Sequence, residues 1–360
     1  MIKEEKIKKL EKEIADARNN LTTDRLDMSF GEIISMYERE EIFINPDFQR
    51  LFRWKDDQKT KLIESILLGI PIPPIFVAED ELGRWELVDG LQRLSTVLSF
   101  FGLLKSKEGK ITAKNNWTLQ DGGIVKYFSG FKCGDLPLKY QLNIKRYACR
   151  VEVVKWDSEY DMRFELFNRL NTGGSPLTSQ EIRNCIFRGV TTKFNDYLKD
   201  NAKLNNFIQL ISPTETQTEQ LYLEELVLRF TSLIFDWKNV QENISEHMTD
   251  FMRKAVRNSK FDYSKYQKIF REVVELLEPL GKDVFRIKGN FSVRLYDAIT
   301  VGIGENLTYY KSLKPEDIEQ QIKELREDSD FQKYAGAAVD SKNRVFKRLE
   351  ASTKIFKPKK

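Results

Sequence analysis

Residues 89–93, Asp-Gly-Leu-Gln-Arg, combine side chains and a predicted turn that suit the binding of a phosphate group. We expect an apolar strand to end at Asp89, Gly90 to permit a tight turn, and a helix to begin at about Gln92. The first turn of a helix has free backbone N–H groups and the positive end of the helix dipole, which together attract anions. Arg93 adds a bidentate donor and Gln92 a neutral one, while Asp89 could hold a magnesium ion or orient a water molecule. A structural interpretation, in which Asp89 caps the helix and Arg93 pairs with it, stays open.

The segment 45–54, Asn-Pro-Asp-Phe-Gln-Arg-Leu-Phe-Arg-Trp, places arginines and aromatic rings just before a predicted helix. Its candidate binding residues are Gln49, Arg50, Arg53 and Trp54. Aromatic rings beside arginine suit stacking on a nucleobase or contact with a DNA strand. The alternative is a loop that anchors the core and leaves its arginines solvated.

A third segment, residues 168–176, contains a glycine-rich turn whose backbone N–H groups could wrap a phosphate. Its candidate binding residues are Asn168, Arg169, Asn171, Thr172 and Gly173. Directly after it, Thr178 and Glu181 have the spacing of a capping box, which is sufficient to explain these two residues structurally.

The elements that must position these groups alternate in type between residues 27 and 190. Hydrophobic periodicity and turn residues predict a helix from Asp56 to Gly69, strands over 75–78 and 85–88, a buried helix over 94–104, a strand over 144–154 and a helix over 158–170. The prolines within residues 70–74 exclude a helix there and lead the chain into the strand at 75. An α+β domain is therefore expected in this half of the chain.

Helical patterns dominate the two remaining parts of the chain. From about residue 191 onward, amphipathic helices are predicted most clearly over 221–235, 263–277 and 317–325. Residues 3–18 predict an exposed helix with Ile7, Leu10 and Ile14 on a narrow stripe. This helix is either solvated or docked on the body, or serves oligomerisation, and two heptads are too few to decide.

The charge balance argues against a strongly basic nucleic-acid-binding protein. The 360 residues contain 59 Lys and Arg against 55 Asp and Glu, and the last ten residues hold four lysines and no acid. Residues 1–350 therefore carry no net charge, although a local basic face remains possible. A hydrophobic content of 41% with 24 Phe excludes a disordered chain.

The single histidine, His247, excludes zinc sites with several histidines and an HNH nuclease motif. A histidine alone in an amphipathic helix is expected to pack or to lie at the surface. A PD-(D/E)xK nuclease is excluded as well, because Glu152 and Lys155 are one residue too far apart.

Cysteine usage and hydropathy indicate a cytoplasmic protein. Cys133, Cys149 and Cys185 lie far apart with no CxxC pair, which is typical of reduced thiols. The first twenty residues alternate charges and lack the apolar stretch of a signal peptide, and no run of 18 apolar residues could span a membrane.

The ordered set of motifs resembles a known family. In order, the motifs are Gln49-Arg50 with Trp54, the Ile-Pro-Ile-Pro-Pro-Ile stretch at 70–75, the Asp-Gly-Leu-Gln-Arg-Leu stretch at 89–94, and the Asn-Arg-Leu-Asn-Thr-Gly stretch at 168–173 with Glu181 and Arg183. Over residues 20–190 the chain is similar to the N-terminal domain of GmrSD-type modification-dependent restriction enzymes, a ParB/sulfiredoxin-like fold. The central signature of that family is Asp-Gly-Gln-Gln-Arg, and this chain departs from it at Leu91.

The resemblance implies that the domain binds and hydrolyses a nucleoside triphosphate with Mg²⁺, coupled to nucleic-acid sensing in phage defence. Together with the helical patterns and the charge of the last ten residues, it gives an exposed N-terminal helix at 1–22, a ParB-like nucleotide-binding domain at 23–190, an all-α domain at 191–350 and a basic tail at 351–360. Two-part members of the family cut DNA with a separate HNH-type domain, which a chain with one histidine cannot supply. The partners implied are DNA, a separate nuclease or defence subunit, and a second copy of the chain.

On this interpretation Asp89 and Arg93 are the catalytic residues, and Asp89 is the magnesium ligand. The nucleotide-binding residues are Gln49, Arg50, Gly90, Gln92, Asn168, Arg169, Asn171, Thr172 and Gly173, with Arg53, Trp54, Glu181 and Arg183 in support. Two alternatives stay open. The domain could bind nucleotide or DNA as a switch without hydrolysis and recruit a nuclease, or it could be a scaffold with a degenerate site.

Overall fold

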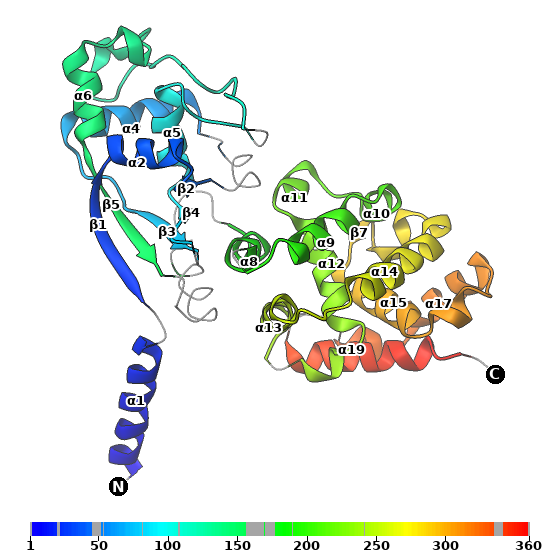
Figure 1. Ribbon diagram of the computed structural model, residues 1–360. Helices are drawn as coiled ribbons and strands as arrows, with labels where there is room; N and C mark the ends of the chain where they lie inside the picture. Colours follow the sequence, from blue (N-terminus) through cyan, green and yellow to red (C-terminus); the bar gives the residue numbers. More distant parts are fainter. Residues whose placement is uncertain are drawn as a thin grey trace. The chain divides into compact units, whose positions relative to one another are not determined.

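The computed structural model describes residues 2–19, 22–44, 52, 54–80, 82–106, 109–155, 169, 177–188, 190–240, 242–334 and 341–358. The chain forms two compact units, Met1–Pro176 and Leu177–Lys360 (Figure 1). The first unit contains a five-stranded sheet with helices, and the second is helical apart from one small hairpin. The predicted order, an α+β domain followed by a helical one, is confirmed.

A mixed five-stranded sheet with the order β1-β5-β3-β4-β2 forms the centre of the first unit. The strands are β1 (Thr23–Ser29), β2 (Ile42–Phe43), β3 (Ile75–Glu79), β4 (Trp85–Asp89) and β5 (Ala148–Val154). The pairs β1–β5 and β3–β4 are antiparallel, whereas β3–β5 and β2–β4 are parallel. The predicted strands at 75–78 and 85–88 are confirmed, and they form a hairpin as their spacing implies.

The strand predicted over 144–154 is shorter in the structure. Residues 144–146 belong to α6 (Leu138–Arg146), and the strand begins at Ala148. Ile144 is buried at the end of that helix, so its apolar side chain continues a helical rather than an alternating pattern. From Cys149 onward, the buried residues Cys149, Val151 and Val153 alternate as predicted.

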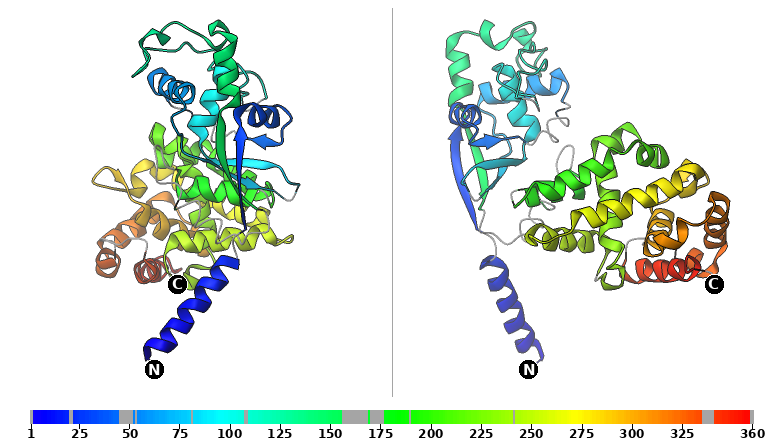
Figure 2. Two further views of the ribbon diagram at one scale, coloured as in Figure 1. Left: turned by 90° about the vertical axis from the view of Figure 1, so that its left-hand side faces the viewer. Right: turned by 45° about the vertical axis from the view of Figure 1, so that its right-hand side comes forward.

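Helices α2 (Phe30–Glu38), α4 (Asp56–Leu68), α5 (Leu91–Phe100) and α6 pack with the sheet and with one another, and α4 lies beside both α5 and α6 (Figures 1 and 2). Helix α4 ends at Gly69 in the left-handed conformation, as predicted, but its N-cap is Lys55 rather than an aspartate. The helix predicted over 94–104 begins earlier, at Leu91, and is followed by a turn in which Gly102 adopts a positive φ of 77°. Two short 3₁₀ helices, η1 (Lys126–Phe128) and η2 (Cys133–Asp135), complete this part.

Helix α1 (Ile2–Asn19) agrees with the helix predicted over 3–18. Every residue from Glu5 to Asp16 is exposed, including the apolar stripe Ile7, Leu10 and Ile14. The helix predicted over 158–170 lies outside the described residues, apart from Arg169.

The second unit consists of packed helices. They are α8 (Ser179–Arg188), α9 (Lys193–Ala202), α10 (Asn205–Ile211), α11 (Glu215–Glu219), α12 (Tyr222–Leu233), α13 (Ile244–Arg257), α14 (Tyr263–Leu277), α15 (Val293–Glu305), α16 (Leu307–Tyr310), α17 (Pro315–Glu327), α18 (Ser329–Tyr334) and α19 (Lys342–Ile355). Short 3₁₀ helices occur at η3 (Trp237–Asn239), η4 (Glu278–Leu280) and η5 (Lys282–Phe285), and β6 (Arg286–Ile287) pairs with β7 (Asn290–Phe291). Helices α12, α14 and α17 confirm the three helices predicted from periodicity.

A buried ion cluster lies in the core of the second unit. Arg229 on α12 donates from Nε and Nη2 to the two carboxylate oxygens of Asp297 on α15, at 2.6 and 2.9 Å. Arg348 on α19 brings its Nη2 to 3.7 Å from the same carboxylate. All three residues are buried, so one aspartate neutralises charge contributed by two other helices.

Candidate functional site

The turn between β4 and α5 has the geometry that its sequence predicts. Strand β4 ends at Asp89, and Gly90 is the N-cap of α5 with φ 94° and ψ 15°, in the left-handed region. The helix begins at Leu91, so the first-turn amides of α5 lie directly after this turn and have no intrahelical acceptor. Gly90 has no side chain that could cap them.

Only glycine fits at position 90 without displacement of the Ile75 side chain. A Cβ atom added to Gly90 would lie 2.5 Å from Cγ2 of Ile75 at the start of β3. The positive φ is itself unfavourable for a residue with a side chain. The turn is therefore held tightly against the neighbouring strand, which fixes the start of α5 relative to β3.

Asp89 and Arg93 form an ion pair across this turn. Nη2 of Arg93 lies 2.8 Å from Oδ2 of Asp89 and also donates to the carbonyl oxygen of Pro74 at 3.0 Å. The side chain of Arg93 is 16% exposed and that of Asp89 40% exposed, so the carboxylate has a face open to solvent. The structural interpretation is thus correct about the pairing, but not about the cap, because the N-cap is Gly90.

Gln92 connects this turn to the second predicted segment. The backbone N–H of Trp54 donates to Oε1 of Gln92 at 3.1 Å. Phe52 is buried, and its carbonyl oxygen accepts a hydrogen bond from Nζ of Lys114 at 2.9 Å. The structure therefore brings Trp54 to the start of α5, as a phosphate site built from both segments requires. Gln49, Arg50 and Arg53 lie outside the described residues.

The third predicted segment adds little to the described geometry. Arg169 is described and exposed, whereas Asn168, Asn171, Thr172 and Gly173 lie outside the described residues. Closure of this loop over the turn at Gly90 stays a prediction.

Positive charge is concentrated in residues 101–150, although the whole chain has a net charge of only +4. This segment contains ten Lys and Arg against three Asp and Glu, a net charge of +7, while the rest of residues 1–176 carries −7. Its exposed cations are Lys110, Lys114, Lys126, Lys132, Lys139, Lys145, Arg146 and Arg150. Exposed apolar side chains accompany them, among them Tyr127, Phe131 and Tyr140. A window-by-window count of charge would have found this segment from the sequence.

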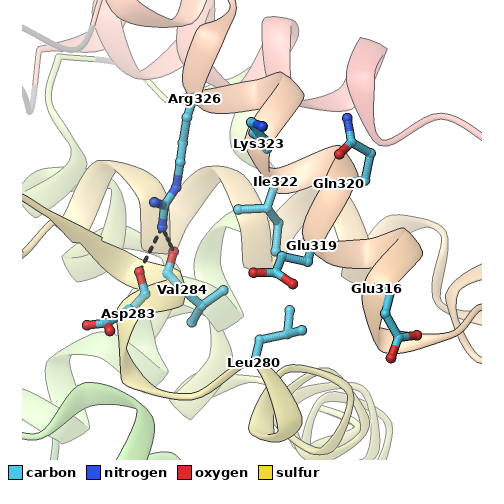
Figure 3. Close-up of a pocket in the computed structure, with 9 residues that line it drawn as sticks. All are labelled: Leu280, Asp283, Val284, Glu316, Glu319, Gln320, Ile322, Lys323 and Arg326. Atoms are coloured by element: carbon cyan, nitrogen blue, oxygen red, sulfur yellow. Dashed lines mark hydrogen bonds between the residues drawn. The ribbon is translucent and has the colours of Figure 1, made fainter.

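A cavity of about 540 Å³ lies in the second unit between α17, η4 and η5 (Figure 3). Arg326 of α17 crosses it and donates from Nη2 to the carbonyl oxygens of Asp283 and Val284, at 2.7 and 2.9 Å. The other charged groups in its lining are Glu316, Glu319 and Lys323, together with the carboxylate of Asp283. The lining thus holds three carboxylates against two cations and includes none of the predicted site residues, so it suits a phosphate less well than the start of α5.

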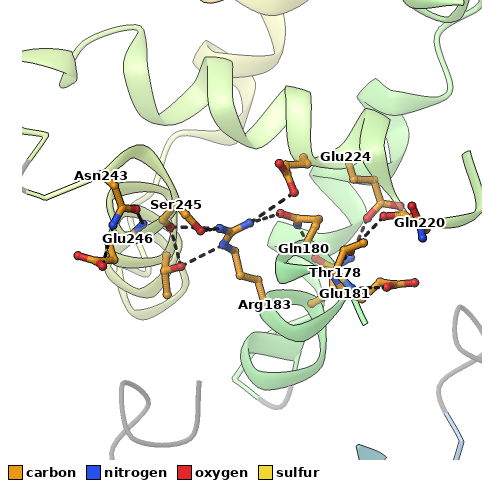
Figure 4. A network of polar contacts seen from close by, with 12 residues as sticks. Thr178, Gln180, Glu181, Arg183, Gln220, Glu224, Asn243, Ser245 and Glu246 are labelled. Carbon is orange, nitrogen blue, oxygen red and sulfur yellow. Dashed lines mark hydrogen bonds and ion pairs between the residues drawn. The ribbon is translucent and has the colours of Figure 1, made fainter. Parts of the chain in front are cut away.

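Glu181 and Arg183 are placed in the second unit, on α8. The predicted capping box is confirmed, since Thr178 N–H donates to Glu181 Oε2 at 2.7 Å and Glu181 N–H to Thr178 Oγ1 at 3.3 Å. Arg183 is fully buried and donates to Thr249, Gln180 and Ser245 (Figure 4). Burial lowers the pKa of Arg183 to about 10. These contacts join α8 to α13, while the supporting role predicted for both residues at the phosphate site stays a prediction.

His247, Cys133 and Cys149 have packing roles. His247 is buried, and its Nε2 lies 3.0 Å from the carbonyl oxygen of Ser232, which fixes the tautomer with the proton on Nε2. Burial raises the pKa of the Cys133 and Cys149 thiols to about 11, so both remain protonated and unreactive near neutral pH. Within the described ranges, no cluster of three or more His, Cys, Asp or Glu could hold a metal ion, and no helix is long and apolar enough to cross a membrane.

Comparisons with known proteins test the predicted family. Neither the curated proteins nor the solved structures give a match. A family model does match residues 30–188, from α2 to α8, and its description is GmrSD restriction endonuclease, N-terminal domain. Helix α8 falls within this match, although its contacts lie in the second unit. The predicted family is confirmed: residues 30–188 belong to the GmrSD restriction endonuclease N-terminal domain family.

Proposed function

We propose that the N-terminal unit binds a nucleoside triphosphate, and hydrolyses it, with its phosphates at the start of α5, and that the chain acts in restriction-type phage defence. The observation that carries the proposal is the ion pair of Asp89 and Arg93 around Gly90, at a helix start whose N-cap residue has no side chain. The first turn of a helix, its dipole and a nearby guanidinium together form an anion-binding arrangement. The family match supports the restriction role.

Each residue of the turn has a role that its contacts suggest. Arg93 is held by Asp89 and Pro74 and would direct its remaining donors to a phosphate oxygen. Asp89, with its solvent-facing carboxylate, would be the residue of this turn that holds Mg²⁺, which neutralises phosphate charge when it is bound. Gln92, which accepts from Trp54, would position the segment before α4 rather than react. Catalysis would rest on positioning and charge stabilisation.

The test measures nucleotide binding and phosphate release from ATP, GTP, CTP and UTP with Mg²⁺, with and without DNA. The variant is Arg93→Ala, and the matched control is Arg84→Ala, because Arg84 also pairs with an aspartate four residues away, Asp80 at 2.8 Å, in the same hairpin. Loss of turnover in Arg93→Ala alone supports an NTPase. Binding without turnover, lost in Arg93→Ala alone, supports a nucleotide switch. Wild-type protein that binds no nucleotide overturns the proposal.

A second candidate function, contact with nucleic acid, is favoured by the +7 charge of residues 101–150. Exposed lysines neutralise backbone phosphates, and exposed aromatic rings stack on unpaired bases. Removal of Lys126, Lys132 and Lys139 should reduce the slope of log affinity against log salt by roughly two to three. The control removes three exposed lysines of the second unit, Lys203, Lys260 and Lys268. Equal effects of the two triple variants would contradict a local contact surface.

A further inference from the structure

Helix α1 has an apolar stripe that is exposed in the part of the chain that the structure describes. Ile7, Leu10 and Ile14 are 45%, 53% and 45% exposed. The 18-residue helix is about 27 Å long, and an amphipathic helix of this length gains most of its stability from packing rather than from intrinsic propensity. The stripe therefore indicates a binding face for another element.

The stripe has the spacing of a coiled-coil seam. Intervals of three and then four residues place Ile7 and Ile14 at the a positions and Leu10 at the d position of a heptad. Isoleucine at a with leucine at d favours two parallel strands. In this register Lys6 and Glu13 occupy g positions and Glu11 an e position, so these three charges border the seam.

The charges beside the seam are self-complementary. In a parallel pair, the residue at a g position of one helix faces the residue at the next e position of the other helix. Lys6 of each helix therefore faces Glu11 of the other, which gives two attractive pairs. In an antiparallel pair that layers Leu10 on Ile14, Glu11 faces Glu11 and Glu13 faces Glu13, and both contacts are repulsive. Opposite charge thus favours the parallel arrangement over this antiparallel one.

The overall charge of the helix also limits the kind of partner. Residues 5–16 contain four lysines and four acidic residues, and Lys9 already pairs with Glu5 at 3.0 Å on the face away from the seam. The whole helix carries a net charge of only +1, which gives it little electrostatic attraction to an anionic membrane or to nucleic acid. We propose that α1 pairs with α1 of a second copy of this chain in a parallel two-stranded coiled coil.

Sedimentation equilibrium of the full chain tests the proposal. The wild type should form a species of twice the 42.3 kDa chain mass. Leu10→Asp should raise the dimer dissociation constant by about tenfold or more, because a carboxylate then enters the seam. Leu82→Asp is the matched control, since Leu82 is an exposed leucine, 77% accessible, in the turn between β3 and β4. A monomeric wild type, or a dimer that Leu10→Asp leaves intact, overturns the proposal.

A charge exchange tests the parallel register independently of folding. Lys6→Glu and Glu11→Lys should each weaken the dimer by roughly tenfold, because each replaces two attractive pairs with repulsive ones. An equimolar mixture of the two variants should recover the wild-type dissociation constant. In the mixed pair the two reversed charges, at position 6 of one helix and position 11 of the other, face each other, and the native Lys6 faces the native Glu11. Only a parallel pair predicts this recovery, and a mixture that stays as weak as its components overturns the register.

Discussion

Nη2 of Arg93 lies 2.8 Å from Oδ2 of Asp89, so the helix start is tied to the strand end that precedes it. The same nitrogen donates to the carbonyl oxygen of Pro74, so the residue before β3 is also held at this turn. Arg93 therefore braces the turn as well as presenting a positive charge. A loss of thermal stability in Arg93→Ala is expected from a binding and from a structural role alike, and nucleotide binding is the readout that separates them.

Replacement of Asp89 by Asn should separate binding from turnover. Loss of the carboxylate removes a negative charge beside the proposed phosphate position and releases Nη2 of Arg93, so nucleotide affinity measured without Mg²⁺ should rise about three- to tenfold. Phosphate release should fall, because the proposed magnesium ligand is gone. Isothermal titration and a phosphate-release assay measure both. Asp27→Asn is the control, since Asp27 pairs with Arg150 on the same unit away from α5. Unchanged affinity in Asp89→Asn would place the phosphates elsewhere.

Substitution of Gly90 by Ala should destabilise the first unit by about 2–4 kcal/mol. Roughly 1–2 kcal/mol comes from the left-handed backbone, and the remainder from the contact of the new Cβ with Ile75. Gly83→Ala isolates the first contribution, because Gly83 has φ 78° and a Cβ added there would meet nothing within 4 Å. Urea unfolding measures the difference between the two variants. Equal losses would show that Ile75 moves aside at little cost.

Glu64 should make the first unit sensitive to acid. Burial acts to raise the pKa of Glu64, but the backbone amides of Gly123, Ile124 and Val125 donate to its carboxylate and the pKa is lowered below its ordinary value of 4.5. The unfolded chain then takes up a proton before the folded one, so this stabilisation is complete above pH 4.5 and is lost as pH falls further.

Glu64→Gln should lower the free energy of unfolding near neutral pH by about 1.5–3 kcal/mol. It should also remove the contribution of Glu64 to the loss of stability below pH 4.5. Urea unfolding over a pH series measures both effects. Glu41→Gln is the comparison, because Glu41 owes its lowered pKa to the exposed Arg39 and should change stability little. A pH profile of Glu64→Gln parallel to that of the wild type would contradict the assignment.

Asp297 should be essential for folding of the helical unit. Its replacement by Asn removes the carboxylate that the buried Arg229 and Arg348 share, which costs about 3–5 kcal/mol. Glu350→Gln removes a half-buried carboxylate that pairs with Lys347 on α19 and should change the melting temperature little. Thermal unfolding followed by circular dichroism compares the two. A mild effect of Asp297→Asn would indicate that water reaches the cluster.

Local patterns were sufficient for most elements of the fold. The helix from Tyr263 to Leu277 and the hairpin at 75–89 follow from periodicity and turn residues, because these signals act within a few residues of each other. The strand before Val151 was extended too far, because the apolar Ile144 fits an alternating and a helical pattern equally well. Packing of α6 on α2 and α4, which no local pattern contains, decides between them.

The sequence by itself determined the family, the α+β and helical order, and the turn at Asp89-Gly90 with its basic partner four residues on. Tertiary structure decided which side chains share that turn: it brought Trp54 to Gln92 and Pro74 to Arg93, and it buried Arg183 in contacts with α13. The physical reason is the range of the forces involved. Caps, turns and helical stripes arise between neighbours in the chain, whereas burial and hydrogen bonding between distant residues depend on the whole packed arrangement.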